Sequence, residues 1–231
     1  MQTKFYVMHY KKNTKRRKRL MSILNKMDID AQWYTEYDKE ELDEKILNKY
    51  YNPDINIFRE RTAGLKTEVE YQQYNGVSKG HVSLCIKYIK CMEDLINSNY
   101  DNAVFLEDDV TFSSICSKET ILNALAIGEE AGWDSIFLGG AFQHQLVTDR
   151  ILAQYKNLLL VDHPATNTTS SFALTKGACR KILGTFDTIC NSIDWEFNYH
   201  FKVNNLKVWH ILPYLFGQLS TSGHEEYTCT L

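Results

Sequence analysis

Three adjacent carboxylates, Glu107, Asp108 and Asp109, are the residues of this sequence best placed to do chemistry. They lie within residues 103–110, where a short apolar run typical of a covered strand in a parallel sheet leads directly into the acidic residues. In open α/β sheets, ligands bind beyond the carboxyl ends of the strands. Neighbouring carboxylates repel one another unless a cation lies between them, and oxygen ligands suit a divalent metal. The pattern favours a metal site over a solvated acidic turn.

A second acidic pair, Asp194 and Glu196, flanks Trp195 at the start of a predicted helix. A carboxylate at this position can simply interact favourably with the helix dipole. The bulky Trp195 instead indicates that the turn packs inward and holds Asp194 near a cleft. A carboxylate in surroundings of low polarity has a raised pKa and is a candidate general base. The spacing leaves both interpretations open.

Positively charged and histidine residues suggest where an anionic ligand would bind. Residues 11–19 hold seven Lys or Arg, which we interpret mainly as the solvated face of a helix, with one or two side chains able to reach a diphosphate. His81 follows Gly76 and Gly80 at a helix start, where backbone N–H groups favour a phosphate. His224 is either a late metal ligand or a surface residue near the chain end.

The elements needed to position these residues alternate between strands and helices. Short apolar or alternating runs predict strands at residues 4–8, 31–34, 103–106, 133–138, 157–161, 172–174 and 207–212. Helical spacing predicts helices after Thr14, over residues 81–97, and after the capping residues Ser117, Thr175 and Ser192. Residues 39–75 and 140–157 are too irregular to assign in detail. We therefore predict one α/β domain over residues 1–231.

Composition excludes several classes of protein. The 231 residues are 44% hydrophobic and 24% charged, with a net charge of −3, which gives no case for general nucleic-acid binding. No stretch approaches the roughly 20 apolar residues of a membrane span. The six Cys show no CxxC spacing that would indicate zinc or a redox pair. With no visible signal peptide, we expect a cytoplasmic protein.

Taken together, these segments resemble glycosyltransferase family 25, which includes bacterial lipooligosaccharide galactosyltransferases and collagen hydroxylysine galactosyltransferases. Residues 105–110 match the Leu-Glu-Asp-Asp-Val motif of the family, and residues 193–195 are similar to its second acidic motif. Further similarities occur at residues 4–8 with Arg16-Arg17, at residues 36–38, at Gly76 with Gly80-His81, and at Pro213, Gln218 and Ser222. Departures from the family pattern are Lys39 for Gly, Tyr74 for Glu, Val77 for Cys and Gly80 for Ser.

The resemblance implies a Rossmann-like domain of GT-A type with a central, mostly parallel sheet. It implies metal-dependent, inverting transfer of galactose or glucose from a UDP-sugar to a saccharide or to hydroxylysine in a collagen-like protein. Asp109 and Glu107 would then hold Mn²⁺ or Mg²⁺, and Asp194 would be the base, with Glu196 in reserve. Contacts to the donor are expected from His81, Tyr37, Asp38 and Asp108.

Two other classes of function fit part of the pattern. A catalytically inactive relative could act as a binding or adhesion module, but such a protein would be expected to lose the acidic motifs that are present here. A metal-dependent phosphoester hydrolase also uses clustered carboxylates. Such a site needs additional ligands, and the seven His of this chain are scattered. The transferase interpretation is therefore preferred.

Overall fold

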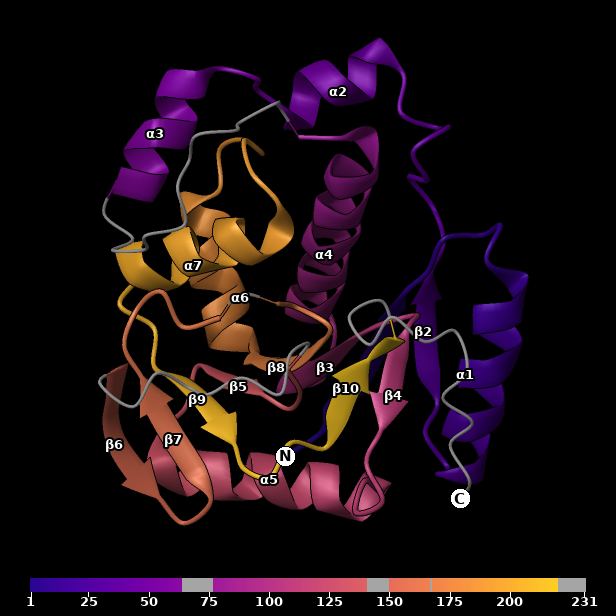
Figure 1. Cartoon of the computed structure of the whole chain (residues 1–231), viewed down its shortest axis with the longest axis vertical. Coiled ribbons are helices and arrows are strands. Elements are labelled where there is room, and N and C mark those ends of the chain that lie inside the picture. Colours follow the sequence, from indigo (N-terminus) through magenta and orange to yellow (C-terminus); the bar gives the residue numbers. More distant parts are fainter. Residues whose placement is uncertain (64–76, 141–149, 167, 220–231) are drawn as a thin grey trace.

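The computed structural model describes residues 1–63, 77–140, 150–166 and 168–219. Its strands are β1 (Thr3–Met8), β2 (Ala31–Tyr34), β3 (Asn102–Glu107), β4 (Val110–Phe112), β5 (Ser135–Phe137), β6 (Ile151–Tyr155), β7 (Leu158–Val161), β8 (Ser171–Thr175), β9 (Val208–Ile211) and β10 (Phe216–Gln218). Its helices are α1 (Thr14–Lys26), α2 (Glu44–Tyr50), α3 (Ile55–Ala63), α4 (Lys79–Asn97), α5 (Lys118–Ala131), α6 (Lys176–Thr185) and α7 (Ile193–Val203). Figure 1 shows their arrangement.

Eight strands form one sheet in the order β2-β1-β3-β8-β5-β9-β7-β6. β1 pairs in parallel with β2 and β3, and β5 pairs in parallel with β9. β8 runs antiparallel between β3 and β5, while β7 is antiparallel to both β9 and β6. Apart from β7 and β8, the strands of this sheet therefore share one direction. The predicted α/β class with a largely parallel sheet is confirmed, and the sheet is mixed.

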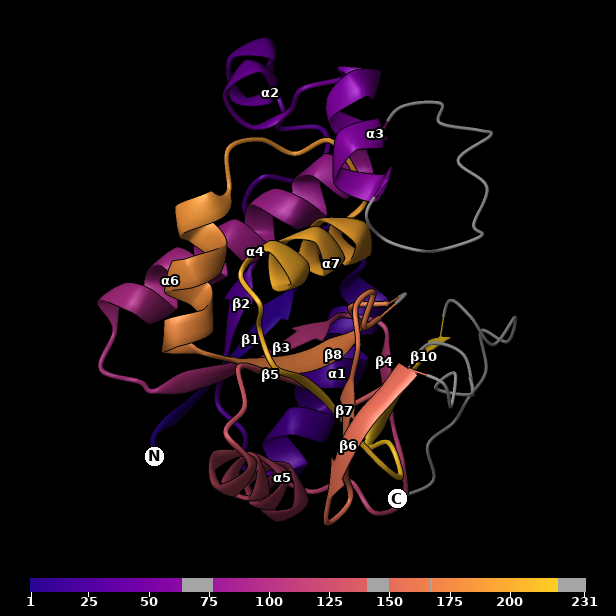
Figure 2. The same cartoon turned by 90° about the vertical axis from the view of Figure 1, so that its left-hand side faces the viewer.

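Helices cover both faces of the sheet, as Figure 2 shows for α4, α6 and α7 on one side and α1 and α5 on the other. Alternation along β1 explains how one strand serves two cores. Tyr6 and Met8 belong to the buried cluster under α4, whereas Phe5 and Val7 belong to the cluster over α1 and α5. Aromatic rings fill the first cluster, where Phe105 and Phe172 stack with centroids 5.3 Å apart. The result is a three-layer sandwich.

Most predicted helix starts are confirmed. The hydroxyls of Ser117 and Thr175 accept hydrogen bonds from backbone N–H groups at the starts of α5 and α6. The prediction for α1 is shifted by one residue, because Asn13 is the N-cap and Thr14 is the first helical residue. Ser192 is the N-cap of α7, although its hydroxyl bonds to Asp194 instead of to the backbone.

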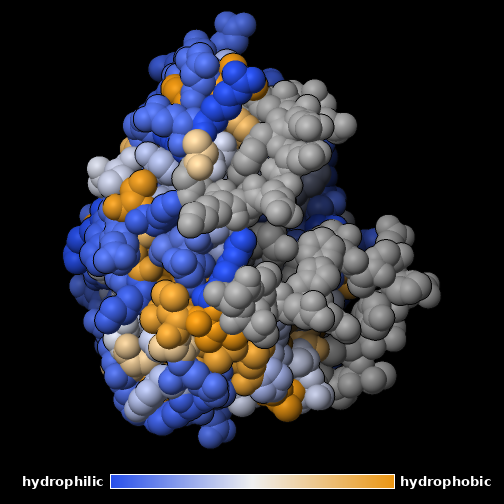
Figure 3. Space-filling view, turned by 60° about the vertical axis from the view of Figure 1, so that its left-hand side comes forward, coloured by the Kyte–Doolittle hydropathy of each residue, from blue (hydrophilic) through white to orange (hydrophobic). Residues whose placement is uncertain are grey.

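The predicted strand at residues 103–106 is confirmed as β3, which is one residue longer at each end. β3 ends at Glu107, Asp108 and Asp109 form a turn, and β4 then pairs antiparallel with β10 outside the main sheet. β4, β6 and β10 are not predicted from the sequence. β6 is an edge strand whose Leu152 is 62% exposed. Figure 3 views the side of the molecule on which β6 and β7 lie, and hydrophobic side chains gather on the surface there. None of the described helices is long and apolar enough to cross a membrane.

Candidate active site

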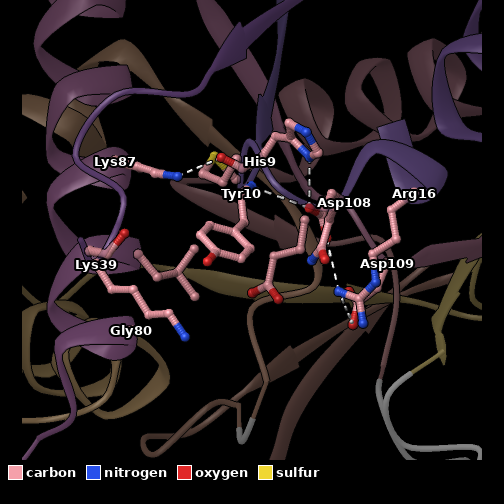
Figure 4. A pocket seen from close by; sticks show the side chains of 13 residues that line it. His9, Tyr10, Arg16, Lys39, Gly80, Lys87, Asp108 and Asp109 are labelled. Carbon is pink, nitrogen blue, oxygen red and sulfur yellow. Dashed lines mark hydrogen bonds and ion pairs between the residues drawn. The ribbon is translucent and has the colours of Figure 1, made fainter. Parts of the chain in front are cut away.

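A pocket of about 280 Å³ opens at the carboxyl ends of β1 and β3. This is the edge at which ligands bind in open α/β sheets. Figure 4 shows side chains from the β1–α1 connection, from α4 and from the β3–β4 turn converging on it. The residues that line the pocket are Met8, His9, Tyr10, Asn13, Arg16, Lys39, Gly80, Ser83, Leu84, Lys87, Glu107, Asp108 and Asp109. The pocket thus contains all three carboxylates singled out in the sequence.

Asp108 ties the β3–β4 turn to the connection between β1 and α1. Its Oδ2 accepts hydrogen bonds from His9 Nδ1 at 2.8 Å and from the Tyr10 backbone N–H at 3.3 Å. Its Oδ1 accepts from the Arg16 guanidinium at 3.0 Å. Asp108 and His9 are both buried, and the carboxylate satisfies His9 Nδ1, whereas His9 Nε2 has no hydrogen-bond partner among the described residues. Two segments of the pocket wall, 99 residues apart in sequence, are fixed together by this carboxylate.

Glu107 and Asp109 form the acidic floor of the pocket. The side-chain amide of Gln218 lies between them, 3.3 Å from Glu107 Oε2 and 3.4 Å from each carboxylate oxygen of Asp109. Thr169 donates its hydroxyl to Glu107 Oε1 at 2.9 Å. Desolvation raises the pKa of Glu107 to about 8, and the negative charges of Asp109, Asp108 and Asp194 add to that shift. A divalent cation at this floor would relieve the same repulsion.

Cationic side chains face this floor from two directions. Arg16 reaches in from α1, and its guanidinium lies 3.6 Å from Asp109 Oδ2. Lys39 lies at the pocket edge with its ammonium 5.5 Å from the centre of the Tyr10 ring, and it makes no ion pair within the described part of the chain. Lys87 is buried, donates to the His9 carbonyl, and pairs with Asp38. Arg16 and Lys39 are therefore the cations best placed to meet an anionic ligand.

Asp194 lies close enough to this pocket to interact electrostatically with Glu107. It belongs to the first turn of α7, and Ser192 donates its hydroxyl to Asp194 Oδ1 at 2.6 Å. Desolvation raises the pKa of Asp194, while the hydrogen bond from Ser192 and, to a smaller extent, nearby His81 oppose the shift. His81 itself is exposed at the start of α4, where its Nδ1 lies 3.1 Å from the Ser78 hydroxyl. The predicted base and the predicted phosphate contact are thus neighbours.

Glu196 has a different environment from Asp194. It is 2% exposed, and its Oε2 accepts from the Arg61 guanidinium at 2.8 Å. Its Oε1 accepts from the backbone N–H groups of Cys190 and Asn191 at 2.7 and 2.8 Å. Glu196 does not line the pocket. Its hydrogen bonds instead hold the loop that leads into α7.

The two remaining predicted donor contacts lie beside the pocket. Asp38 is buried, and it accepts from Lys87 Nζ at 2.5 Å and from the Lys11 backbone N–H at 3.0 Å. Tyr37 adopts a left-handed backbone conformation with φ of 63° and packs against the aromatic core. Neither side chain is part of the pocket lining. Gly76, Tyr74, Ser222 and His224 lie outside the described residues.

A complete metal site made of protein ligands alone is not present in the described ranges, where no three His, Cys, Asp or Glu side chains are grouped suitably. Glu107 and Asp109 still suit a cation whose remaining coordination positions are filled by the phosphate groups of a bound substrate. Mg²⁺ in particular is commonly held by one or two carboxylates together with substrate phosphates and water. Glu107 and Asp109, both within 3.4 Å of the same Gln218 nitrogen, provide such a pair.

Three residues that shape the pocket have no site role predicted from the sequence: His9, Lys87 and Gln218, the last of which enters only through the family resemblance. His9 directly follows β1, so its place at a strand end was a usable signal. Lys87 lies on the mostly apolar face of α4, where a lone buried cation signals a paired acid, here Asp38. Gln218 reaches the carboxylates only because β10 pairs with β4, which no local pattern indicates.

Three solved structures that resemble this chain share little of its sequence. No protein family and no curated protein matches its sequence. The crystal structure of A197 from STIV is 14% identical, with a TM-score of 0.46 over 91% of this chain and 82% of that one. S. aureus TarS 1-349 is 11% identical, with a TM-score of 0.43 over 94% of this chain and 60% of that one.

A third solved structure, mannose-1-phosphate geranyltransferase from Thermus thermophilus, is 10% identical, with a TM-score of 0.45 over 93% of this chain and 75% of that one. These similarities concern the layout of the α/β fold. The resemblance to glycosyltransferase family 25 stays a prediction, and function has to be inferred from the side chains of the pocket.

Proposed function

We propose that this protein is a metal-dependent, inverting glycosyltransferase that moves galactose or glucose from a UDP-sugar to a hydroxyl group. The observation that carries the proposal is the pairing of an acidic floor, Glu107 and Asp109, with the cations Arg16 and Lys39 in one pocket. A nucleotide-sugar presents a diphosphate that needs positive charge around it and a sugar that needs hydrogen-bond acceptors. The acceptor would be a saccharide or hydroxylysine in a collagen-like protein.

In this proposal Glu107 and Asp109 hold Mn²⁺ or Mg²⁺, which when bound supplies positive charge to the diphosphate leaving group. Arg16 and Lys39 contribute further positive charge at the pocket wall. Asp108 keeps the wall in place through His9 and Arg16, and a carboxylate has about four lone-pair positions, so it can still accept a hydrogen bond from a ribose or sugar hydroxyl.

Asp194 takes the role of the general base. Its raised pKa makes it a better proton acceptor than an exposed carboxylate, and it lies near both Glu107 and His81. In an inverting displacement, the base removes the proton of the acceptor hydroxyl while the oxygen attacks the anomeric carbon and UDP departs. Asp194 receives that proton. For Glu196 we propose only a structural role, because Arg61 and two backbone N–H groups occupy its oxygens.

The proposal is tested by measuring UDP release from UDP-galactose and UDP-glucose with Mn²⁺, alone and with a panel of saccharide acceptors. Asp194→Asn should lower the turnover rate by roughly 10²–10⁴-fold while leaving UDP affinity unchanged, because a general base contributes to the chemical step alone. Asp30→Asn, at an exposed carboxylate remote from the pocket in sequence, is the matched control and should behave as the wild type.

Different outcomes separate the parts of the proposal. Turnover that survives in Asp194→Asn would show that another group is the base. UDP binding without transfer to any acceptor or to water would favour a binding module. Release of pyrophosphate from UTP and a hexose 1-phosphate would contradict the glycosyltransferase assignment, because that is the reaction of a nucleotidyltransferase.

A further inference from the structure

Positive charge is concentrated on α1 and the residues that lead into it. Residues 11–26 contain eight Lys or Arg and no Asp or Glu. The remaining 215 residues contain 18 Lys or Arg and 29 Asp or Glu, which is a net charge of −11. Figure 1 shows α1 on the outside of the molecule, at its right-hand edge. The protein is therefore strongly dipolar, with one basic helix on an otherwise acidic body.

The arginines and lysines of this helix have different surroundings. Arg16 and Arg19 turn inward, where Arg16 bonds to Asp108 and Arg19 donates to the Val110 carbonyl at 2.7 Å. The Arg17 guanidinium lies 5.4 Å from the centre of the Trp33 ring. Lys15, Lys18 and Lys26 are exposed and form no ion pair with any described residue. These three lysines, which we call the outer lysines, have no structural partner in that part of the chain.

The charge pattern of α1 opposes the stability of the helix itself. A helix N-terminus favours acidic residues, yet the first turn of α1 has none, and no side chain caps it. Lys15 and Lys18 are three residues apart, at a spacing where like charges repel. Sequences usually break such local rules where a function requires it. The missing negative charge is expected to come from a partner.

We propose that the outer lysines dock the protein on a membrane surface rich in anionic lipid. Basic residues next to an anionic membrane surface are attracted to it, each contributing about 1 kcal/mol. A lysine ammonium is a point charge suited to a diffuse layer of headgroups, whereas arginine suits bidentate recognition of single phosphates. A flat surface contacts this face alone, so the acidic remainder of the molecule stays away from it. Partly exposed Met21 on the same helix adds an apolar contact.

Docking through α1 would place the pocket close to the membrane. Arg16 of the same helix lines the pocket, so the pocket edge and the docked face are separated by about one helix diameter, ~10 Å. If the proposed transfer activity holds, the acceptor hydroxyl would belong to an amphiphile anchored in that surface. Docking itself does not depend on what the pocket binds.

The experiment is cosedimentation of the protein with vesicles of phosphatidylcholine alone and of phosphatidylcholine mixed with phosphatidylglycerol. We expect binding only to the mixed vesicles, and loss of binding at about 1 M salt, where charges are screened beyond ~3 Å. The variant Lys15→Gln/Lys18→Gln/Lys26→Gln should bind roughly a hundredfold more weakly, because each basic residue near an anionic surface contributes about 1 kcal/mol.

The matched control is Lys45→Gln/Arg180→Gln/Lys207→Gln, which removes the same charge from exposed positions on other elements and should bind as the wild type. Far-ultraviolet circular dichroism should show both variants folded, with the α1 variant no less stable than wild type because repulsion is relieved. Equal binding to both vesicle types, or full binding by the α1 variant, would overturn the proposal. Tighter binding to duplex RNA or DNA than to the mixed vesicles would also overturn it.

Discussion

At the scale of single residues, the three carboxylates of the β3–β4 turn have different tasks because they have different neighbours. Asp108 accepts hydrogen bonds from His9, Tyr10 and Arg16 and so holds two segments of the pocket wall together. Glu107 and Asp109 face each other across Gln218 and retain free acceptor capacity. Of the three adjacent carboxylates, Asp108 therefore holds the pocket wall together, and Glu107 and Asp109 are the candidate metal ligands.

Lys39 is available to contact an anionic ligand directly, because it lines the pocket and has no ion-pair partner among the described residues. Lys39→Gln should weaken UDP binding roughly tenfold, since a hydrogen bond to a charged group contributes about 1.5 kcal/mol. Binding of uridine, which lacks the diphosphate, should not change. Calorimetric titration of both ligands measures the difference.

The control for Lys39 is Lys12→Gln, which removes an equal charge from an exposed residue that pairs with Glu40 at 2.8 Å. UDP affinity should be unaffected in that variant. If both substitutions weaken UDP binding equally, Lys39 acts only through the general field of the basic segment, and the direct contact is refuted.

At the scale of elements, α7 is held in place by a buried ion pair. Arg61 of α3 is 6% exposed and donates to Glu196 at 2.8 Å and to the Thr188 carbonyl at 2.8 Å. Glu196 in turn bonds to the backbone just before α7. Through this chain of contacts α3 fixes the turn that carries Asp194. The α3–α7 contact therefore matters for the site although neither Arg61 nor Glu196 enters it.

Removing one partner of the Arg61–Glu196 ion pair should destabilise the folded protein. Arg61→Met should lower the free energy of unfolding by about 3–5 kcal/mol, because it leaves a buried carboxylate without its counter-charge. Asp187→Asn also removes a partner of Arg61, but this carboxylate is 72% exposed, so the loss should stay below about 1 kcal/mol. Urea unfolding of the two variants measures both values, and similar small losses would show that Arg61 does not anchor α7.

Local sequence pattern predicted most elements and failed where pairing is non-local. β1, β3, α4 and α5 were found because their apolar spacing and their caps are encoded within each segment. β10 has only three residues and exists because it pairs with β4, about a hundred residues earlier. The antiparallel placement of β8 between β3 and β5 likewise depends on the sheet as a whole.

The same limit applies to the site. The carboxylates were predicted from one strand end, and Asp194 from one helix start. The partners that decide their roles come from distant parts of the chain: His9 for Asp108, Gln218 for Glu107 and Asp109, and Arg61 for Glu196. Residue types and spacing can therefore indicate where a site lies, while tertiary contacts determine the role of each residue in it.

At the scale of the whole molecule, stability should depend on a histidine buried far from the pocket. His210 on β9 stacks on Phe137 with centroids 4.9 Å apart. Its Nε2 lies 2.7 Å from the Ala165 carbonyl, to which it donates, and its Nδ1 accepts from the Tyr214 hydroxyl at 2.9 Å. The neutral ring is fully satisfied, and burial lowers the pKa of His210 to about 4.

In the unfolded chain, His210 has an ordinary pKa of about 6.5. The unfolded state therefore binds more protons than the folded state between about pH 6.5 and 4. The free energy of unfolding should therefore fall as pH drops through that window, with His210 contributing on the order of 3 kcal/mol. Urea unfolding across the window measures the slope. His210→Gln should make the slope shallower, and equal slopes in the two proteins would show that His210 is not responsible.

In the proposed function, Glu107 and Asp109 bind a cation together with a nucleotide diphosphate. The most direct test is thermal unfolding of wild type, Asp109→Asn and Asp30→Asn with UDP, UDP-galactose or UDP-glucose, in Mn²⁺ or in chelator. A ligand at about a hundred times its Kd stabilises the native state by roughly 2.7 kcal/mol. We expect a rise in Tm for wild type and Asp30→Asn that needs both Mn²⁺ and the nucleotide and that disappears in Asp109→Asn. If the Tm of the wild type rises with none of these ligands, Glu107 and Asp109 do not form a cation and nucleotide site.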